Sequence, residues 1–183
     1  MATETEVKFR VRDLAAVRRR ILRAGGRFLG AVVETDVYFD TPDAALRRGD
    51  RGLRIRRFRR LRGGTCDGLA PLLTYKGPRA RSASAKIRPE FQARIDDPDA
   101  VEEVLKALGL RPAMIVRKRR SSFRLGRCRV ELDELPRLGR FVEVEAPDER
   151  ALRAACRRLQ LAGRPILVPY TRLILQARRG KRR

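Results

Sequence analysis

The sequence predicts an α+β fold: a closed, eight-stranded antiparallel β-barrel that forms a tunnel, with helices packed on its outside. Three observations support this prediction. About eight segments alternate between apolar and polar residues, the period of a strand with two different faces. The few helical segments between them do not follow a βαβ order, which favours an antiparallel sheet. About eight strands is also the number that closes into a compact barrel.

The first predicted strand shows the alternation most simply. Val7, Phe9 and Val11 face one side, whereas Glu6 and Lys8 face the other. The same period predicts later strands at 28–40, 51–60, 70–76, 86–95, 112–125, 128–135 and 139–146. Each has an apolar face that needs cover. Helices packed outside would supply it and turn the charged faces inward.

Helical segments are predicted over 14–24, 43–48, 98–108 and 147–161, and a last amphipathic segment covers 169–178. Asp13 and Asp97 are suitable N-caps for the first and third of these, because their carboxylates can accept from unpaired helical N–H groups. The glycines of 61–69 predict a hairpin connection, and 77–85 predicts a mobile loop.

The length of 183 residues fits one domain, which we place at 1–177, and we expect the basic tail 178–183 to be disordered. No stretch approaches the ~18 apolar residues of a membrane span. The first ten residues have acids where a signal peptide needs bases, and they lack its apolar region. We therefore expect a cytoplasmic protein with no membrane partner.

The absence of histidine excludes Ser-His-Asp and Cys-His catalysis and every histidine-bound metal. The three cysteines are widely spaced, offer no CxxC motif and are expected to stay reduced. Any metal must then be held by carboxylates, which favours a hard ion such as Mg²⁺ or Mn²⁺.

The charge of the chain predicts a polyanionic partner. There are 45 Lys and Arg against 22 Asp and Glu, a net charge of +23. Composition alone is compatible with nucleic acid, a phosphorylated small molecule, an anionic membrane, or a solvated surface without a ligand. The run from Arg54 to Arg62 is the best candidate for nucleic-acid binding.

The charged faces of the predicted strands have sorted signs, with acid pairs near the two ends of the chain and basic pairs in the middle. On an open sheet these charges would merely be solvated. Inside a closed barrel, clustered carboxylates need a cation and opposed bases need a polyanion. A triphosphate with its metal meets both needs. The chain has no GxxxxGK[ST] loop, so side chains would have to hold the phosphates.

Short motifs that contain these charged residues follow one another along the chain from Glu4 to Tyr170. They are Glu4-Thr-Glu-Val-Lys8, Asp36-Val-Tyr-Phe-Asp40, Leu53-Arg-Ile-Arg56, Thr74-Tyr-Lys-Gly-Pro78, Arg88-Pro-Glu90, Lys118-Arg-Arg120, Val130-Glu-Leu-Asp133 and Leu138-Gly-Arg-Phe-Val-Glu-Val-Glu145. In this order they resemble the CYTH family, the triphosphate tunnel metalloenzymes, whose signature is ExExK. That family includes class IV adenylyl cyclases, thiamine triphosphatases and inorganic triphosphatases. The resemblance implies an eight-stranded tunnel that binds a triphosphate with Mg²⁺ or Mn²⁺.

The resemblance also implies roles for individual residues. The metal-binding acids would be Glu4, Glu6, Asp133, Glu143 and Glu145. The phosphate-binding bases would be Lys8, Arg54, Arg56, Lys76, Arg88, Lys118 and Arg120. We assign catalysis to Glu4, Glu6 and Lys8, and expect Glu90 only to orient its neighbours. Gln92 departs from the acid that many members carry, and the stretch Val168-Pro-Tyr170 lacks a lysine and resembles the cyclase-like branch.

The leading functional prediction is metal-dependent hydrolysis of an organic or inorganic triphosphate such as ATP, thiamine triphosphate or inorganic triphosphate. The first alternative is a class IV adenylyl cyclase that makes cyclic AMP and pyrophosphate from ATP. The second is non-catalytic binding of RNA or polyphosphate, although nucleic acid is not expected to be the main ligand. The general base could be a carboxylate, Lys8 or metal-bound water. A homodimer is possible by analogy with the cyclase branch.

Overall fold

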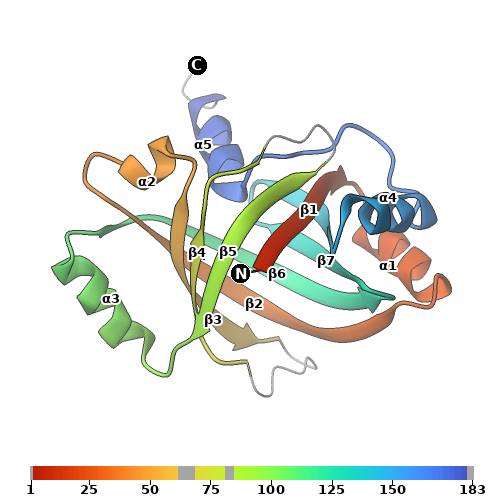
Figure 1. Cartoon of the computed structure of the whole chain (residues 1–183). Coiled ribbons are helices and arrows are strands. Elements are labelled where there is room, and N and C mark those ends of the chain that lie inside the picture. The colour runs from red at the N-terminus through yellow and green to blue at the C-terminus, as the bar shows by residue number, and fades with distance from the viewer. Residues whose placement is uncertain (1, 62–68, 81–84, 181–183) are drawn as a thin grey trace.

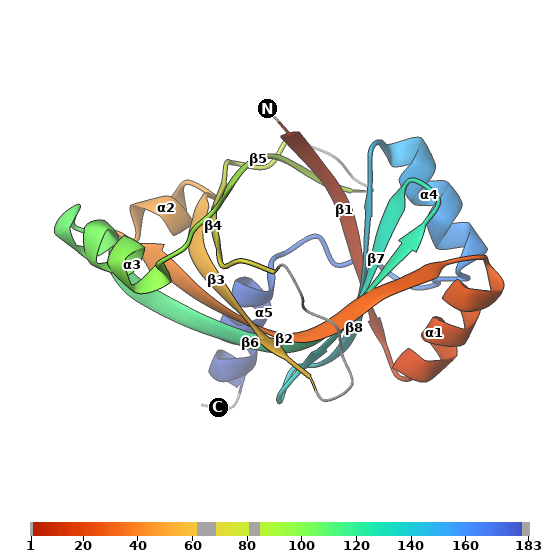
Figure 2. The same ribbon diagram turned by 90° about the horizontal axis from the view of Figure 1, so that it is seen from below.

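The computed structural model describes residues 2–61, 69–80 and 85–180, with side chains from residue 5 onward. Eight antiparallel strands close into a barrel in the order β1-β5-β4-β3-β2-β6-β7-β8, and β8 pairs with β1 to complete it (Figures 1 and 2). The strands are β1 (Ala2–Val11), β2 (Arg27–Asp40), β3 (Gly52–Arg60), β4 (Leu72–Lys76), β5 (Lys86–Arg94), β6 (Arg111–Leu125), β7 (Cys128–Leu135) and β8 (Gly139–Ala146). The predicted antiparallel barrel is therefore confirmed.

Five helices lie around this barrel within the described ranges. They are α1 (Leu14–Arg23), α2 (Ala45–Arg48), α3 (Pro98–Ala107), α4 (Glu149–Arg158) and α5 (Tyr170–Gly180). The side chains of Asp13 and Asp97 cap α1 and α3 as predicted, and Asp148 caps α4 in the same way. None of these helices is long and apolar enough to cross a bilayer.

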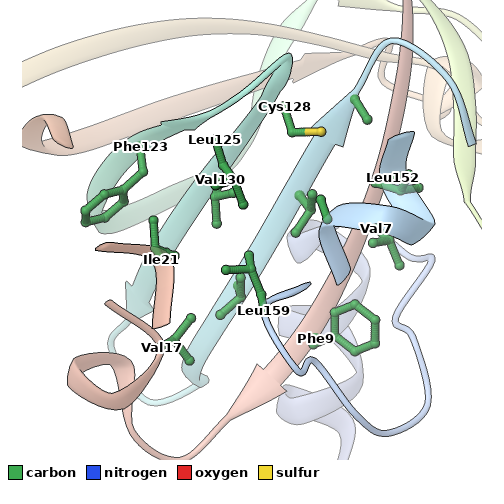
Figure 3. Close-up of a cluster of buried hydrophobic side chains, with 14 of the residues drawn as sticks. Val7, Phe9, Val17, Ile21, Phe123, Leu125, Cys128, Val130, Leu152 and Leu159 are labelled. Atoms are coloured by element: carbon green, nitrogen blue, oxygen red, sulfur yellow. The ribbon is translucent and has the colours of Figure 1, made fainter. Parts of the chain in front are cut away.

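The main apolar core lies between the barrel and the helices α1 and α4, not inside the barrel (Figure 3). Val7 and Phe9 of β1 pack there with Val17 of α1 and Leu152 of α4. A second cluster places Leu105 of α3 against the outer side of β2 and β3. Where the apolar face of a strand turns outward to these helices, as Val7 and Phe9 of β1 do, the alternate charged residues turn into the tunnel.

Three predicted segments differ from the structure or fall partly outside it. The helix α5 continues to Gly180, so residues 178–180 of the segment expected as a disordered tail are helical, and 181–183 lie outside the described residues. The predicted hairpin connection 61–69 has only its two ends within the described residues. Of the predicted loop 77–85, Gly77 and Ala80 donate backbone hydrogen bonds to β5.

Candidate functional site

The interior of the barrel is a tunnel lined by charged side chains. One cavity of about 760 Å³ reaches the mouth bordered by α2 and α5, and a second of about 810 Å³ opens at the other end. The two cavities share six lining residues: Arg54, Arg56, Lys76, Arg120, Glu131 and Glu145. The tunnel is thus one charged passage with a mouth at each end.

The first group in the tunnel is a buried cluster on β2 and β3. Asp36 accepts hydrogen bonds from Arg54 Nη1 at 2.9 Å and from Arg56 Nε at 2.6 Å. Arg56 also lies 3.0 Å from Glu34. Burial opposes the ionisation of Asp36, but the two arginines outweigh it and hold the pKa of Asp36 well below its usual range. Both guanidinium groups are therefore fixed toward the tunnel by a charged carboxylate behind them.

A second group joins β6 to β7. Asp133 is fully buried and accepts from Lys118 Nζ at 3.1 Å and from Arg120 Nε at 2.7 Å. The hydroxyl of Tyr170, at the start of α5, donates to the same carboxylate at 2.9 Å. Burial opposes the ionisation of Glu34, yet Arg120, Arg56 and Lys118 outweigh it and lower its pKa to about 2. Lys118 and Arg120 are thus positioned by buried carboxylates on two sides.

The third group lies on the paired strands β1 and β8. In register, Glu6 stands opposite Glu145, and Lys8 stands opposite Glu143. Lys8 Nζ is 2.8 Å from Glu143, whereas Glu6 forms an ion pair with Lys86 of β5. Three carboxylates are therefore contributed by two adjacent strands, beside the cations of the rest of the wall.

These three carboxylates have different electrostatic environments. Burial opposes the ionisation of Glu6, but Lys86, Lys8 and Lys76 together outweigh it and hold the pKa of Glu6 far below its usual range. The pKa of Glu143 is lowered in the same way, because Lys8 and Lys118 outweigh the effect of burial. Glu145 is solvent-exposed, yet partial desolvation and then the charges of Glu6 and Glu90 raise its pKa. An excess of negative charge therefore remains around Glu145.

The donor set on β1 and β8 fits a hard divalent cation, since it offers only carboxylate oxygens. Among the described residues no three acidic groups already form a metal cage, and Glu6 and Glu143 each hold a lysine. Glu145 has no ion-pair partner within the described part of the chain, and its raised pKa shows that a nearby cation would be favourable. The side chain of Glu4 lies outside the described side chains, although its backbone stands opposite Arg88.

The structure brings most of the predicted site residues to one cavity. The 760 Å³ cavity is lined by Glu6, Lys8, Arg54, Arg56, Lys76, Arg88, Lys118, Arg120, Glu143 and Glu145. Lys76 is paired with Glu90 at 2.5 Å, and Arg88 donates to the carbonyl of Gly77. Asp133 is fully buried beneath Lys118, Arg120 and Tyr170, so a role as metal ligand would require it to exchange one of the four hydrogen bonds that these side chains donate.

Four residues that shape the tunnel had no role in the sequence prediction: Glu34, Asp36, Lys86 and Tyr170. Glu34 and Asp36 are two residues apart on one strand, so their shared face could be recognised, but their basic partners on β3 and β6 could not. The Arg54–Arg62 run is divided by strand alternation. Arg54 and Arg56 point into the tunnel, whereas Arg57 lies outside and pairs with Asp99 of α3 at 2.5 Å.

Comparison with known proteins finds the CYTH domain over residues 2–163. The chain is 30% identical over 142 residues to "Putative adenylate cyclase MJ0240" of Methanocaldococcus jannaschii, covering 78% of this chain and 75% of that protein. It is also 30% identical over 157 residues to "Adenylate cyclase CyaB" of Aeromonas hydrophila, covering 81% and 72% of the two chains.

Solved structures share the barrel. The PH1819 protein of Pyrococcus horikoshii superimposes with a TM-score of 0.80 at 26% identity, over 94% of this chain and 98% of that one. The Hippeastrum protein HpAC1, for which a dominant triphosphatase activity is described, superimposes with a TM-score of 0.64 at 18% identity, over 84% of each chain. The second likeness concerns the fold alone.

Proposed function

The chain belongs to the CYTH domain family, and from this membership we propose that it is a divalent-metal-dependent enzyme that acts on a triphosphate inside its tunnel. The observation that carries the proposal is the composition of the 760 Å³ cavity. Carboxylates of β1 and β8 line the same space as the bases Arg54, Arg56 and Lys76. A metal-bound triphosphate is a ligand that complements both signs of charge.

Each group of residues has a separate task in this proposal. Arg54, Arg56, Lys118 and Arg120 would bind phosphate oxygens, and the carboxylates behind them keep these bases oriented without moving during the reaction. Lys8, held by Glu143, would add a further positive charge. Glu6 and Glu145, with Glu4 and Glu143, would hold Mg²⁺ or Mn²⁺. The bound ion supplies charge neutralisation at the phosphates.

Hydrolysis is the reaction that we propose first. A water oxygen bonds to the terminal phosphorus, the bridging P–O bond breaks, and orthophosphate leaves. The basic walls of the tunnel favour this reaction because they stabilise charge on the transferred group and on the leaving group. The protonated bases cannot accept the proton of the water, so the base would be one of the carboxylates on β1 or β8.

Cyclisation is the second candidate, and the names of the two relatives at 30% identity favour it. In that reaction the ribose 3′-hydroxyl of ATP bonds to the α-phosphorus and pyrophosphate leaves. The tunnel is open at both mouths, so the nucleoside could lie toward either end. The two reactions differ in which phosphorus lies next to the carboxylates.

One assay separates the alternatives. The protein is incubated with ATP, inorganic triphosphate or thiamine triphosphate in Mg²⁺ and in Mn²⁺, and cyclic AMP, pyrophosphate and orthophosphate are quantified. Orthophosphate release supports hydrolysis, and equal amounts of cyclic AMP and pyrophosphate support cyclisation. No turnover of any triphosphate, together with no binding of inorganic triphosphate by calorimetry, would refute the proposal.

The metal assignment has its own test. Glu145→Gln removes a carboxylate that pairs with no described base, so we expect the metal concentration for half-maximal turnover to rise at least tenfold. Exposed Glu103→Gln on α3 is the control and should leave it unchanged. Glu4→Gln and Glu6→Gln should abolish metal-dependent turnover. Full activity of all three tunnel variants at low metal would contradict the assignment.

A further inference from the structure

The outer surface of the barrel carries a cluster of arginines that the tunnel does not use. It lies on three adjacent strands, β3, β2 and β6. Across β2, Val33 is paired with Arg59 on one side and with Arg119 on the other. Thr35 is paired in the same way with Arg57 and Arg117. Side chains of one register row share one face of the sheet, so these four arginines form a two-by-two grid.

The grid lies on the side of the sheet opposite the tunnel. The alternate residues Arg54, Arg56, Lys118 and Arg120 line the tunnel cavities, so their neighbours along each strand face outward. Arg59, Arg117 and Arg119 are exposed to solvent. Helices α3 and α1 lie near the two ends of the β2–β6 wall (Figure 2). A ligand on this surface would therefore not need to enter the tunnel.

Three of the four arginines are not neutralised within the described part of the chain. Arg57 pairs with Asp99 at 2.5 Å and lies 3.6 Å from Glu102, so α3 compensates its charge. The acid nearest Arg119 in register is Glu134, which lies 3.6 Å from Arg140 instead. Arg59, Arg117 and Arg119 have no ion pair with any described acid. Like charges gathered on one sheet face repel one another unless an anion joins them.

The spacing of the grid suits a chain of phosphates better than a single one. Residues two apart on a strand are separated by about 6.6 Å, and strands on either side of β2 by about 9.6 Å. When these three side chains extend from the sheet, their guanidinium groups are spread over the surface, and a polymer of phosphates can contact all of them at once. A nucleic-acid duplex carries one negative charge per ~1.7 Å of its axis, and guanidinium groups bind its phosphates bidentately.

We propose that Arg59, Arg117 and Arg119 form a second binding surface, for the phosphate backbone of a nucleic-acid duplex, separate from the tunnel. Phe58, the aromatic residue between Arg57 and Arg59, lines the tunnel cavity and not this surface. The surface therefore offers guanidinium groups but no ring on which a base could stack. Binding is then independent of sequence and depends strongly on salt.

The test compares two triple variants of equal charge. Arg59→Gln, Arg117→Gln and Arg119→Gln together remove the grid, and Arg150→Gln, Arg157→Gln and Arg158→Gln remove three exposed arginines of α4. The probe is a fluorescent 20-base-pair DNA duplex of mixed sequence, titrated at several salt concentrations. The grid variant should lose at least tenfold in affinity at low salt. The slope of log K against log salt should become shallower by about 3, one for each lost contact.

Three outcomes would overturn the proposal. One is an equal loss of affinity in both triple variants, which would mean that only the net charge matters. Another is displacement of the duplex by inorganic triphosphate at concentrations that saturate the tunnel, which would place the duplex at the tunnel mouth. The third is tighter grid-dependent binding to phosphatidylserine vesicles than to the duplex. Thermal unfolding and triphosphate binding should be the same in both variants, because all six side chains are exposed.

Discussion

Tyr170 links the buried ion pairs of the tunnel to the helix at its mouth. Its hydroxyl is 2.9 Å from Asp133, and Lys8 Nζ lies 3.9 Å from the centre of its ring. The second lysine, Lys118, lies 5.1 Å from the same ring. Cations over an aromatic face are stabilised when desolvated. A single side chain therefore positions two lysines of the tunnel and the carboxylate between Lys118 and Arg120.

Tyr170→Phe should keep the ring and lose the hydrogen bond. We expect a loss of about 1.5–3 kcal/mol in the free energy of unfolding, since the bond is made to a buried charged group. Affinity for inorganic triphosphate should fall several-fold because Asp133 holds Lys118 and Arg120 less rigidly. Urea unfolding and calorimetry measure the two effects. Tyr75→Phe on the outside of the barrel is the control, and equal losses in both variants would contradict a specific role for Tyr170.

Asp36→Asn should be among the most damaging substitutions inside the tunnel. It removes the negative charge that neutralises Arg54 and Arg56, and breaking one side of a buried ion pair costs about 3–5 kcal/mol. Urea unfolding measures the loss. Asp43→Asn is the matched control, because Asp43 also pairs with an arginine, Arg48, but at the surface. Similar urea midpoints for the two variants would refute this account of the cluster.

Single residues show how far the sequence could predict this site. Glu6, Lys8, Arg54 and Arg56 were recognisable because each pair shares one face of a strand. The role of Asp36 was not recognisable. Its partners lie on another strand, and the register that brings them together depends on the packed barrel. The predicted separation of charges, with acids near the chain ends and bases in the middle, is only partly present. Glu34 and Asp36 of the middle strands lie among the bases.

At the scale of elements, α1 and α4 stabilise the barrel from outside, whereas α5 contributes Tyr170 to the charged interior. Leu152 of α4 is 2% exposed and belongs to the core that also contains Val7 and Val17. Its environment is therefore independent of the ion pairs in the tunnel.

Leu152→Ala should lower the free energy of unfolding by about 2–5 kcal/mol, through lost burial and the cavity that remains. Affinity for inorganic triphosphate, measured well below the unfolding temperature, should be unchanged. Leu108→Ala, at a leucine that is 72% exposed, is the control and should change stability by less than about 0.5 kcal/mol. A large loss of triphosphate affinity in Leu152→Ala would show that the outer core and the tunnel are coupled.

The helices were predictable where a capping residue marked their start. Asp13 and Asp97 each accept from two backbone N–H groups at a helix start, so the sequence located α1 and α3 to within one residue. No comparable residue in the sequence indicated where α5 ends. Its last residues are basic, which suggested disorder, but basic side chains in a final helical turn also interact favourably with the helix dipole.

At the scale of the whole molecule, closure of the sheet into a barrel could be predicted from the sequence, but the order of the strands around the barrel could not. Eight strands with one apolar and one charged face must hide the apolar face under helices, and this argument needs no knowledge of neighbours. The pairing of β2 with β6, and of β1 with both β5 and β8, joins segments far apart in the chain. A local period contains no information about such pairings.

The buried carboxylates together predict how stability depends on pH. The pKa values of Glu6, Glu34, Asp36 and Glu143 are lower in the folded protein than their ordinary values of 4.5 and 3.8, and that of Glu34 falls to about 2. The unfolded chain therefore binds protons more readily than the folded one. The stability from these groups is complete above about pH 4.5 and is lost as pH falls toward 2. Glu145 contributes to stability with the opposite sign. Its pKa is raised, so its ionisation lowers the free energy of unfolding.

We therefore expect the urea midpoint, measured without divalent cations, to change little between pH 8 and 5.5 and to fall steeply between pH 4.5 and 3. Asp36→Asn should show a shallower fall, because the variant lacks one of the carboxylates whose protonation drives the transition. Glu103→Gln, at an exposed glutamate of α3, should follow the wild-type curve. A wild-type midpoint that stays constant down to pH 3 would mean that the tunnel carboxylates are not held ionised by their basic partners, and the electrostatic basis of the proposed site would then fail.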